Sequence, residues 1–216
     1  MTRGILIIGN ESALYQAICA EAAKRVEQYA TSVFTANNAN TTTDKAGNLL
    51  DWNPSSPLSA RTLLIGAENI LGKINETILV CSPSSLYGTA GDLSPAEIDK
   101  YINEQIKSWF FLVREITLYY KRQGSGKLAM TVPDTATGFE KTGKNRETQI
   151  DLLGCTAAAS INVLAQSVLT GGAMVFSGLN PGAGGEFASW LFKILEEDNP
   201  KNNGKWHRFS KLSFFN

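Results

Sequence analysis

The chain has 216 residues, enough for one large domain, and 43% of them are hydrophobic, which allows a sizeable core. Lysine plus arginine and aspartate plus glutamate number 20 each, so no single-sign field favours nucleic acid or an anionic membrane as a partner. No charged, apolar leader begins the sequence, and no internal apolar run is expected to reach the about 18 residues that a membrane helix needs. These features predict a cytoplasmic protein with a single domain over residues 1–216.

Short apolar runs alternate with longer helical patterns along the chain. The first, ILIIGNESALYQAI over residues 5–18, is typical of a buried strand, a turn and an amphipathic helix. Strands are predicted at residues 5–8, 32–35, 48–50, 77–81, 127–132, 173–177 and 206–209, and helices at 14–28, 60–71, 95–122, 152–169 and 186–197. This alternation predicts a Rossmann-type, doubly wound α/β fold, with a seven-stranded, mainly parallel sheet and helices on both faces.

Two polar segments are predicted to be loops, and few side chains in the sequence could bind a metal ion. Residues 36–47 and 134–148 are rich in Asn, Thr, Gly and Lys and are predicted to be exposed loops. Cys19, Cys81 and Cys155 lie in separate apolar stretches, which favours reduced core thiols over disulfides. His207 is the only histidine, and we expect it on an edge strand or an interface. No metal site is expected from this set of residues.

The order and spacing of seven segments resemble the short-chain dehydrogenase/reductase family from end to end. The segments are ILIIGNES, NLLDWN, GKINETILVCSPS, YYKRQGSGKLAMT, GCTAAASINVLAQSVL, FSGLNPG and NNGKWHRFS. The most specific pieces are RQGSGKLAM, similar to the family's turn into its fifth strand, and Asp51, at the place where family members hold the adenine ring. The resemblance implies the fold of a nicotinamide-dependent oxidoreductase.

The positions that would hold the cofactor depart from the family pattern. The family's phosphate turn, G-x-x-x-G-x-G, falls on Gly9, Ala13 and Tyr15, and Tyr15 is predicted to fill the space beside the helix amino terminus where pyrophosphate binds. The family's Asn-Asn-Ala-Gly stretch, which flanks the nicotinamide ribose, falls on residues 80–83, with no match. We therefore interpret six positions as a vestigial cofactor site and expect no cofactor: Gly9, Asn10, Ala13, Tyr15, Asp51 and Cys81.

The family's catalytic positions hold no group that can do the same chemistry. Aligned through AQSVL, the catalytic tyrosine and lysine fall on Gly154 and Ala158, neither of which titrates. The serine falls near Pro133, and the helix asparagine of the proton relay falls near Gln105. Other titratable groups, such as Tyr120 on another helix, are poorly placed to replace them. We expect no catalytic residue at these positions.

The chain keeps the segments that the family uses for assembly and shortens the one that covers substrate. After NPGAGGEFASW the chain passes from Pro181 into the last helix within a few residues, so the substrate lid is predicted to be shortened. The family's fourth and fifth helices, residues 95–122 and 152–169, keep apolar patterns, and four residues are predicted to form an interface: Trp109, Phe110, Val113 and Ala158. The resemblance implies a homo-oligomer or a pairing with an active relative.

Three functions stay open. The first is a pseudoenzyme that acts as a non-catalytic structural or regulatory subunit, paired through its fourth and fifth helices with an active oxidoreductase of this family. The second is a divergent oxidoreductase with an atypical site that depends on NAD or NADP. The third is a sensor that binds another small ligand in the degenerate crevice.

Overall fold

A computed structural model describes residues 3–25, 28–34, 49–86, 91–133, 139–142, 147–179, 182–197 and 199–210. The helices are α1 (Ala13–Arg25), α2 (Pro57–Leu71), α3 (Pro95–Ile102), α4 (Ser108–Gln123), α5 (Leu152–Leu169) and α6 (Gly184–Glu196), with a π-helical turn at Asn103–Lys107 and a 3-10 turn at Pro200–Asn202. The strands are β1 (Gly4–Asn10), β2 (Gln28–Phe34), β3 (Glu76–Val80), β4 (Lys127–Thr131), β5 (Phe139–Thr142), β6 (Glu147–Ile150), β7 (Met174–Ser177) and β8 (Trp206–Arg208).

The main sheet has six parallel strands in the order β2-β1-β3-β4-β7-β8. Every residue of β1 and β3 is buried, as expected for central strands of a parallel sheet that is covered on both sides. Alternation along β1 sends Ile5 and Ile7 into one core cluster and Leu6 and Ile8 into the other.

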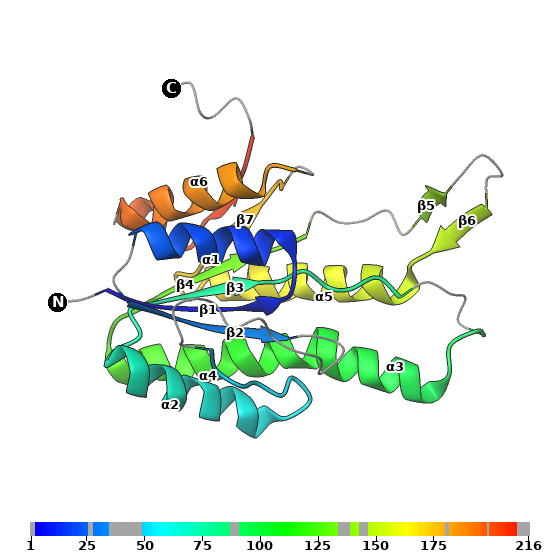
Figure 1. Cartoon of the computed structure of the whole chain (residues 1–216), viewed down its shortest axis with the longest axis horizontal. Helices are drawn as coiled ribbons and strands as arrows, with labels where there is room; N and C mark the ends of the chain where they lie inside the picture. The colour runs from blue at the N-terminus through cyan, green and yellow to red at the C-terminus, as the bar shows by residue number, and fades with distance from the viewer. Residues whose placement is uncertain are drawn as a thin grey trace.

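Two helical layers cover the sheet (Figure 1). Side chains of α1 and α6 form one core cluster with the sheet, and side chains of α2, α4 and α5 form the other. All the strands of the main sheet point the same way, so their carboxyl ends lie along one edge, which we call the carboxyl edge. The predicted doubly wound α/β fold is confirmed.

Of the predicted strand at residues 48–50, the described residues 49 and 50 form no strand, so the main sheet of the described chain has six strands and not seven. Within the described residues, Leu49 makes a single parallel bridge to Thr31 of β2. The Leu50 amide donates to the Thr31 carbonyl at 2.8 Å, and the Ser32 hydroxyl donates to the Leu50 carbonyl at 2.9 Å. Residues 49 and 50 are therefore held beside β2 by these contacts without forming a strand.

Part of the segment predicted to be an exposed loop forms a hairpin. Strands β5 and β6 pair antiparallel, with Phe139 opposite Ile150, inside and just beyond residues 134–148. The prediction of a loop is wrong here because the strands are polar and short, so neither apolar alternation nor length distinguished them from a loop. In Figure 1 the hairpin projects beyond the main sheet, and it leads directly into α5.

The predicted helix over residues 95–122 is divided by the π-helical turn. It begins at a capping box, in which the Ser94 hydroxyl accepts from the Glu97 amide and the Glu97 carboxylate accepts from the Ser94 amide. It ends where Gly124 adopts a left-handed conformation and its amide donates to the Tyr120 carbonyl at 2.9 Å. The π-helical turn changes which side chains face the sheet before and after it.

Helix α5 corrects the expectation that no apolar run is long enough for a membrane. Within the described part of the chain, it is the one helix whose length and composition would allow it to cross a membrane. Its Ile161, Leu164 and Ala165 pack into the core with residues of β1, β4 and β7. In this fold, therefore, α5 is one of the helices that cover the sheet.

Candidate functional site

The strand order places a topological switch point at the carboxyl edge between β1 and β3. From β1 the chain passes to β2 on one side, and later returns to place β3 on the other side of β1. Ligands of open α/β sheets bind outside the carboxyl ends of the strands at such a topological switch point. The last residue of β1 is Asn10, and Cys81 and Ser82 follow β3, so these residues border the switch point.

The carboxamide of Asn10 crosses the switch point. Its Nδ2 donates to the Ser82 carbonyl at 2.8 Å and to Oε1 of Gln105 at 2.7 Å. Gln105 is buried and lies in the π-helical turn, which brings its side chain to the carboxyl edge. Its Oε1 also accepts from the Ser84 amide at 3.4 Å. The two amide side chains thus join β1, the segment after β3 and the long helix.

Tyr15, predicted to fill the space beside the amino terminus of α1, is buried. Its ring lies in the core between α1 and the sheet, and a Cβ on Gly9 would lie 2.8 Å from Tyr15 Cδ2. The glycine at position 9 therefore allows helix and strand to approach closely around the ring. Ala13, at the first position of α1, is exposed, so the helix terminus remains accessible.

The amino-terminal turns of α1 and α6 lie next to each other. A Cβ on Gly184, the first residue of α6, would lie 3.5 Å from Ala17 Cβ and 3.8 Å from the Ala13 carbonyl oxygen. Both helices follow parallel strands and cover the same face, so both begin at the carboxyl edge (Figure 1). First-turn amides have no acceptor within their own helix, and two such turns together favour an anion.

The residues onto which the catalytic positions of the family were predicted to fall have structural contacts. A Cβ on Gly154 would lie 2.1 Å from Oδ2 of Asp151, because that carboxylate folds over the first turn of α5. Ala158 is buried against the sheet. Pro133 follows β4, and its carbonyl accepts from Nδ2 of Asn162 at 3.2 Å. Gln105 is part of the amide network described above.

Two side chains that the sequence reasoning did not single out join this edge. The Tyr101 hydroxyl of α3 donates to the Ser84 carbonyl at 2.5 Å. Asp151 caps α5, and its Oδ1 accepts from the Gly154 amide at 2.9 Å and the Leu86 amide at 3.0 Å. An aspartate just before a helical pattern is a capping signal, so Asp151 was detectable as a cap. Its bond to Leu86 depends on the tertiary fold.

Burial raises the pKa of the Tyr101 phenol, and the negative charges of Asp151 and Cys155 add to that rise. The phenol is therefore neutral at pH 7 and acts here as a hydrogen-bond donor. The same cause, burial, raises the pKa of the Cys81 thiol. Neither group is poised to give or take a proton near neutral pH.

His207 lies on an edge strand, as the sequence suggested, and the role predicted for Asp51 stays a prediction. Asp51 is exposed and follows the bridge to β2, so it stands near the carboxyl end of that strand. His207 lies on the edge strand β8, where its ring stacks on Phe176 and Nε2 is 3.1 Å from the Asn202 carbonyl oxygen. Within the ranges that the structure describes, no three metal-ligating side chains converge.

The interface prediction needs correction for three of its four residues. Trp109, Val113 and Ala158 are 0%, 6% and 3% exposed and belong to the core or pack on it, so they have no surface for a partner. Phe110 is 45% exposed. Pro181 lies outside the described residues, and the structure resumes at Gly182, shortly before α6.

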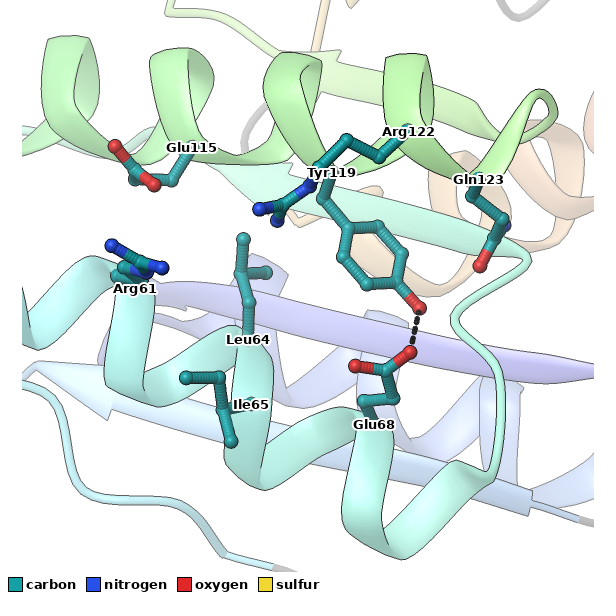
Figure 2. A pocket seen from close by; sticks show the side chains of 8 residues that line it. All are labelled: Arg61, Leu64, Ile65, Glu68, Glu115, Tyr119, Arg122 and Gln123. Carbon is teal, nitrogen blue, oxygen red and sulfur yellow. Dashed lines mark hydrogen bonds between the residues drawn. The ribbon is translucent and has the colours of Figure 1, made fainter.

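A cavity of about 410 Å³ lies between α2 and α4, away from the switch point (Figure 2). Its lining residues are Arg61, Leu64, Ile65, Glu68, Glu115, Tyr119, Arg122 and Gln123. Two arginines and two glutamates balance in charge, and the Tyr119 hydroxyl donates to Glu68 at 3.2 Å and accepts from the Ile74 amide at 3.4 Å. The cavity lies along the second half of α4, away from the carboxyl edge, and these contacts join α2 to α4.

No protein-family model matches the chain, and no curated protein matches it in sequence. Solved structures do match it. A short-chain dehydrogenase from Bacillus anthracis superposes with a TM-score of 0.70 over 99% of this chain and 97% of its own, at 14% identity. NADH-dependent reductase A1-R′, complexed with NAD, gives 0.70 over 96% and 95% of the two chains, at 12% identity. ElxO with NADP bound gives 0.70 over 96% and 97%, at 12% identity.

These neighbours correct one expectation and settle the fold. Because structures of the same fold hold NAD or NADP, the expectation that this chain takes no cofactor is contradicted. The topology, the two helical layers and the near-complete superpositions agree. The chain has the fold of the short-chain dehydrogenases/reductases.

Proposed function

We propose that the protein is a divergent oxidoreductase that binds NAD or NADP at the carboxyl edge, with an atypical set of residues around the reacting groups. The observation that carries this proposal is the pair of helix amino termini, α1 and α6, next to the β1/β3 switch point. Bound NAD or NADP would supply or accept a hydride there. Proteins with this fold that hold NAD or NADP support the choice of cofactor.

The residues of this edge fit two parts of a dinucleotide, the pyrophosphate and the adenosine. The first turns of α1 and α6, which include the exposed Ala13 and Gly185, offer amides for a pyrophosphate. Asp51, exposed near the end of β2, offers a carboxylate for hydrogen bonds from the adenosine part. Exposed Glu11, directly before the Ser12 cap of α1, opposes a phosphate by charge.

The test is a titration of NADH and NADPH followed by tryptophan fluorescence. We expect a saturable signal with micromolar affinity, which corresponds to about 8 kcal/mol of binding free energy. Asp51→Asn should weaken binding several-fold, and Glu11→Gln should strengthen it, because each changes charge on an opposite side of the ligand. Asp99→Asn, an exposed carboxylate on α3, is the matched control and should leave affinity unchanged.

Turnover is tested next, by the loss of NADPH absorbance with a panel of ketones and aldehydes. A protein that shows no saturable binding of either dinucleotide up to millimolar concentration contradicts the proposal. Binding without turnover of any substrate contradicts its oxidoreductase part and favours the second candidate function.

The second candidate function is a non-catalytic subunit that pairs with an active relative through α4 and α5. It is favoured by the structural roles of the residues at Gly154 and Ala158, and by the exposed face of these helices. That face includes Phe110 and Leu118 on α4 and Leu152 and Val163 on α5. Coexpression with active oxidoreductases of this fold, followed by size-exclusion chromatography, tests it. Elution as a monomer in every combination contradicts it.

A further inference from the structure

The segment Ser82–Leu86, which we call the β3 loop, is held by side chains from four separate elements. At its start, Asn10 of β1 donates to the Ser82 carbonyl at 2.8 Å. In its middle, Gln105 of the π-helical turn accepts from the Ser84 amide at 3.4 Å. Because Asn10 also donates to Gln105 at 2.7 Å, these two contacts form one connected network.

The second half of the β3 loop is held from the other side. Tyr101 of α3 donates to the Ser84 carbonyl at 2.5 Å, and Asp151 at the start of α5 accepts from the Leu86 amide at 3.0 Å. Ser84 is therefore held through both its amide and its carbonyl. The side chains of Ser84 and Ser85 are nevertheless exposed. The loop has a fixed backbone and accessible hydroxyls.

Asp151 connects the β3 loop to the first turn of α5. Its Oδ1 accepts from two amides of different elements, Leu86 of the loop and Gly154 of α5. The absence of a side chain at position 154 leaves room for this carboxylate. A single oxygen thus ties the β3 loop to the start of α5.

We propose that Asn10, Gln105, Tyr101 and Asp151 are positioning residues, which pre-organise the β3 loop as a rigid wall of the ligand site and present the Ser84 and Ser85 hydroxyls to a polar group of the ligand. This rests on the proposed function, because the loop borders the switch point where we place the dinucleotide. A wall that is fixed before binding loses little conformational freedom on binding, which favours affinity.

The experiment measures hydrogen exchange of the Ser84 and Leu86 amides by NMR, together with NADH affinity, in the full chain. Asp151→Ala should accelerate Leu86 exchange about tenfold or more and weaken NADH binding several-fold. Asp151→Asn keeps the accepting Oδ1 and should restore both. Ser94→Ala removes a helix cap of α3 without touching the loop and should change neither. Tyr101→Phe, a second and milder variant, should accelerate exchange within the loop.

The outcomes separate the two proposals. Unchanged Leu86 exchange in Asp151→Ala overturns the positioning role, whatever the NADH affinity. Faster exchange with unchanged NADH affinity also overturns it, because the loop would then be rigid for stability alone. Absence of NADH binding to the wild-type protein counts against the proposed function, and Leu86 exchange still decides whether the four side chains hold the loop.

Discussion

Asp151 and Gly154 depend on each other, and their coupling can be measured. In the wild type, Gly154→Ala places a Cβ 2.1 Å from Asp151 Oδ2 and displaces the carboxylate, which cancels the gain of about 1 kcal/mol that alanine brings to a helix. In an Asp151→Ala background the same change should stabilise the protein by about 1 kcal/mol. Urea denaturation of the four proteins measures this cycle. Equal effects of Gly154→Ala in both backgrounds would contradict the coupling.

The buried Tyr101 phenol should make the stability of the protein depend on pH in the alkaline range. Burial, and then the charges of Asp151 and Cys155, raise its pKa in the folded protein, so the neutral phenol is favoured by folding. Its contribution is fully present below about pH 10, the unfolded value, and is lost as pH rises above it. Tyr101→Phe should make the alkaline fall in unfolding free energy shallower, by at most about 1.4 kcal/mol per pH unit. Identical slopes in thermal or urea unfolding would refute this.

Single residues show where the sequence was informative and where it was not. The absence of titratable groups at Gly154 and Ala158 is visible in the sequence, because it follows from the residue types themselves. The burial of the Tyr15 ring could not be predicted from the sequence, because a tyrosine beside a helix terminus can point outward or into the core. The ring packs beside Gly9, and this close approach exists only in the folded chain.

Among the elements, α4 ends in a turn whose energy is testable. Gly124 has φ of 75°, and a Cβ there would meet open space, so Gly124→Ala costs conformational strain alone. We expect a loss of about 1 kcal/mol in the free energy of unfolding. Gly171→Ala, at a glycine outside the left-handed region, is the control and should cost less. Equal losses in chemical denaturation would show that backbone handedness is not the cause.

The elements that the sequence predicted well are those with a strong local pattern. Buried strands such as β1 and the capped helix that starts after Ser94 carry apolar runs or capping residues that act locally. A strand was wrongly predicted at residues 48–50, where Leu49 makes a single bridge, and the β5–β6 hairpin was missed. Both outcomes depend on pairing with neighbouring chain segments, which short segments do not encode locally. The π-helical turn likewise leaves no pattern in residue type.

At the scale of the whole molecule, substitutions of Trp109 and Phe110 by aspartate are expected to have opposite effects on folding. Trp109 is 0% exposed within the core, so Trp109→Asp buries an uncompensated charge and should unfold the domain. Phe110 is 45% exposed, so Phe110→Asp should keep the circular dichroism of the wild type. If α4 carries an interface, Phe110→Asp alone should lower the oligomeric state in size-exclusion chromatography. A folded Trp109→Asp protein would contradict the observed packing.

The candidate site could be predicted only in outline. Parallel strands place their carboxyl ends together, so the edge that holds Asn10, Cys81 and Asp51 follows from the strand assignments. The links among Asn10, Gln105, Tyr101 and Asp151 span up to about 140 residues of sequence and require the strand order and the π-helical turn. Such contacts have no local signature.

Two tryptophans that lie close together on the α2–α4 side could report ligand binding through their intrinsic fluorescence. The rings of Trp52 and Trp109 lie with centroids 6.0 Å apart and planes inclined by 58°, one partly buried and the other enclosed in the core. Trp52 follows Asp51 directly, so a ligand that settles against that carboxylate changes the surroundings of one indole and leaves its neighbour enclosed. The wavelength of tryptophan emission and the energy transfer between the two rings would then report ligand binding near Asp51 without an attached dye.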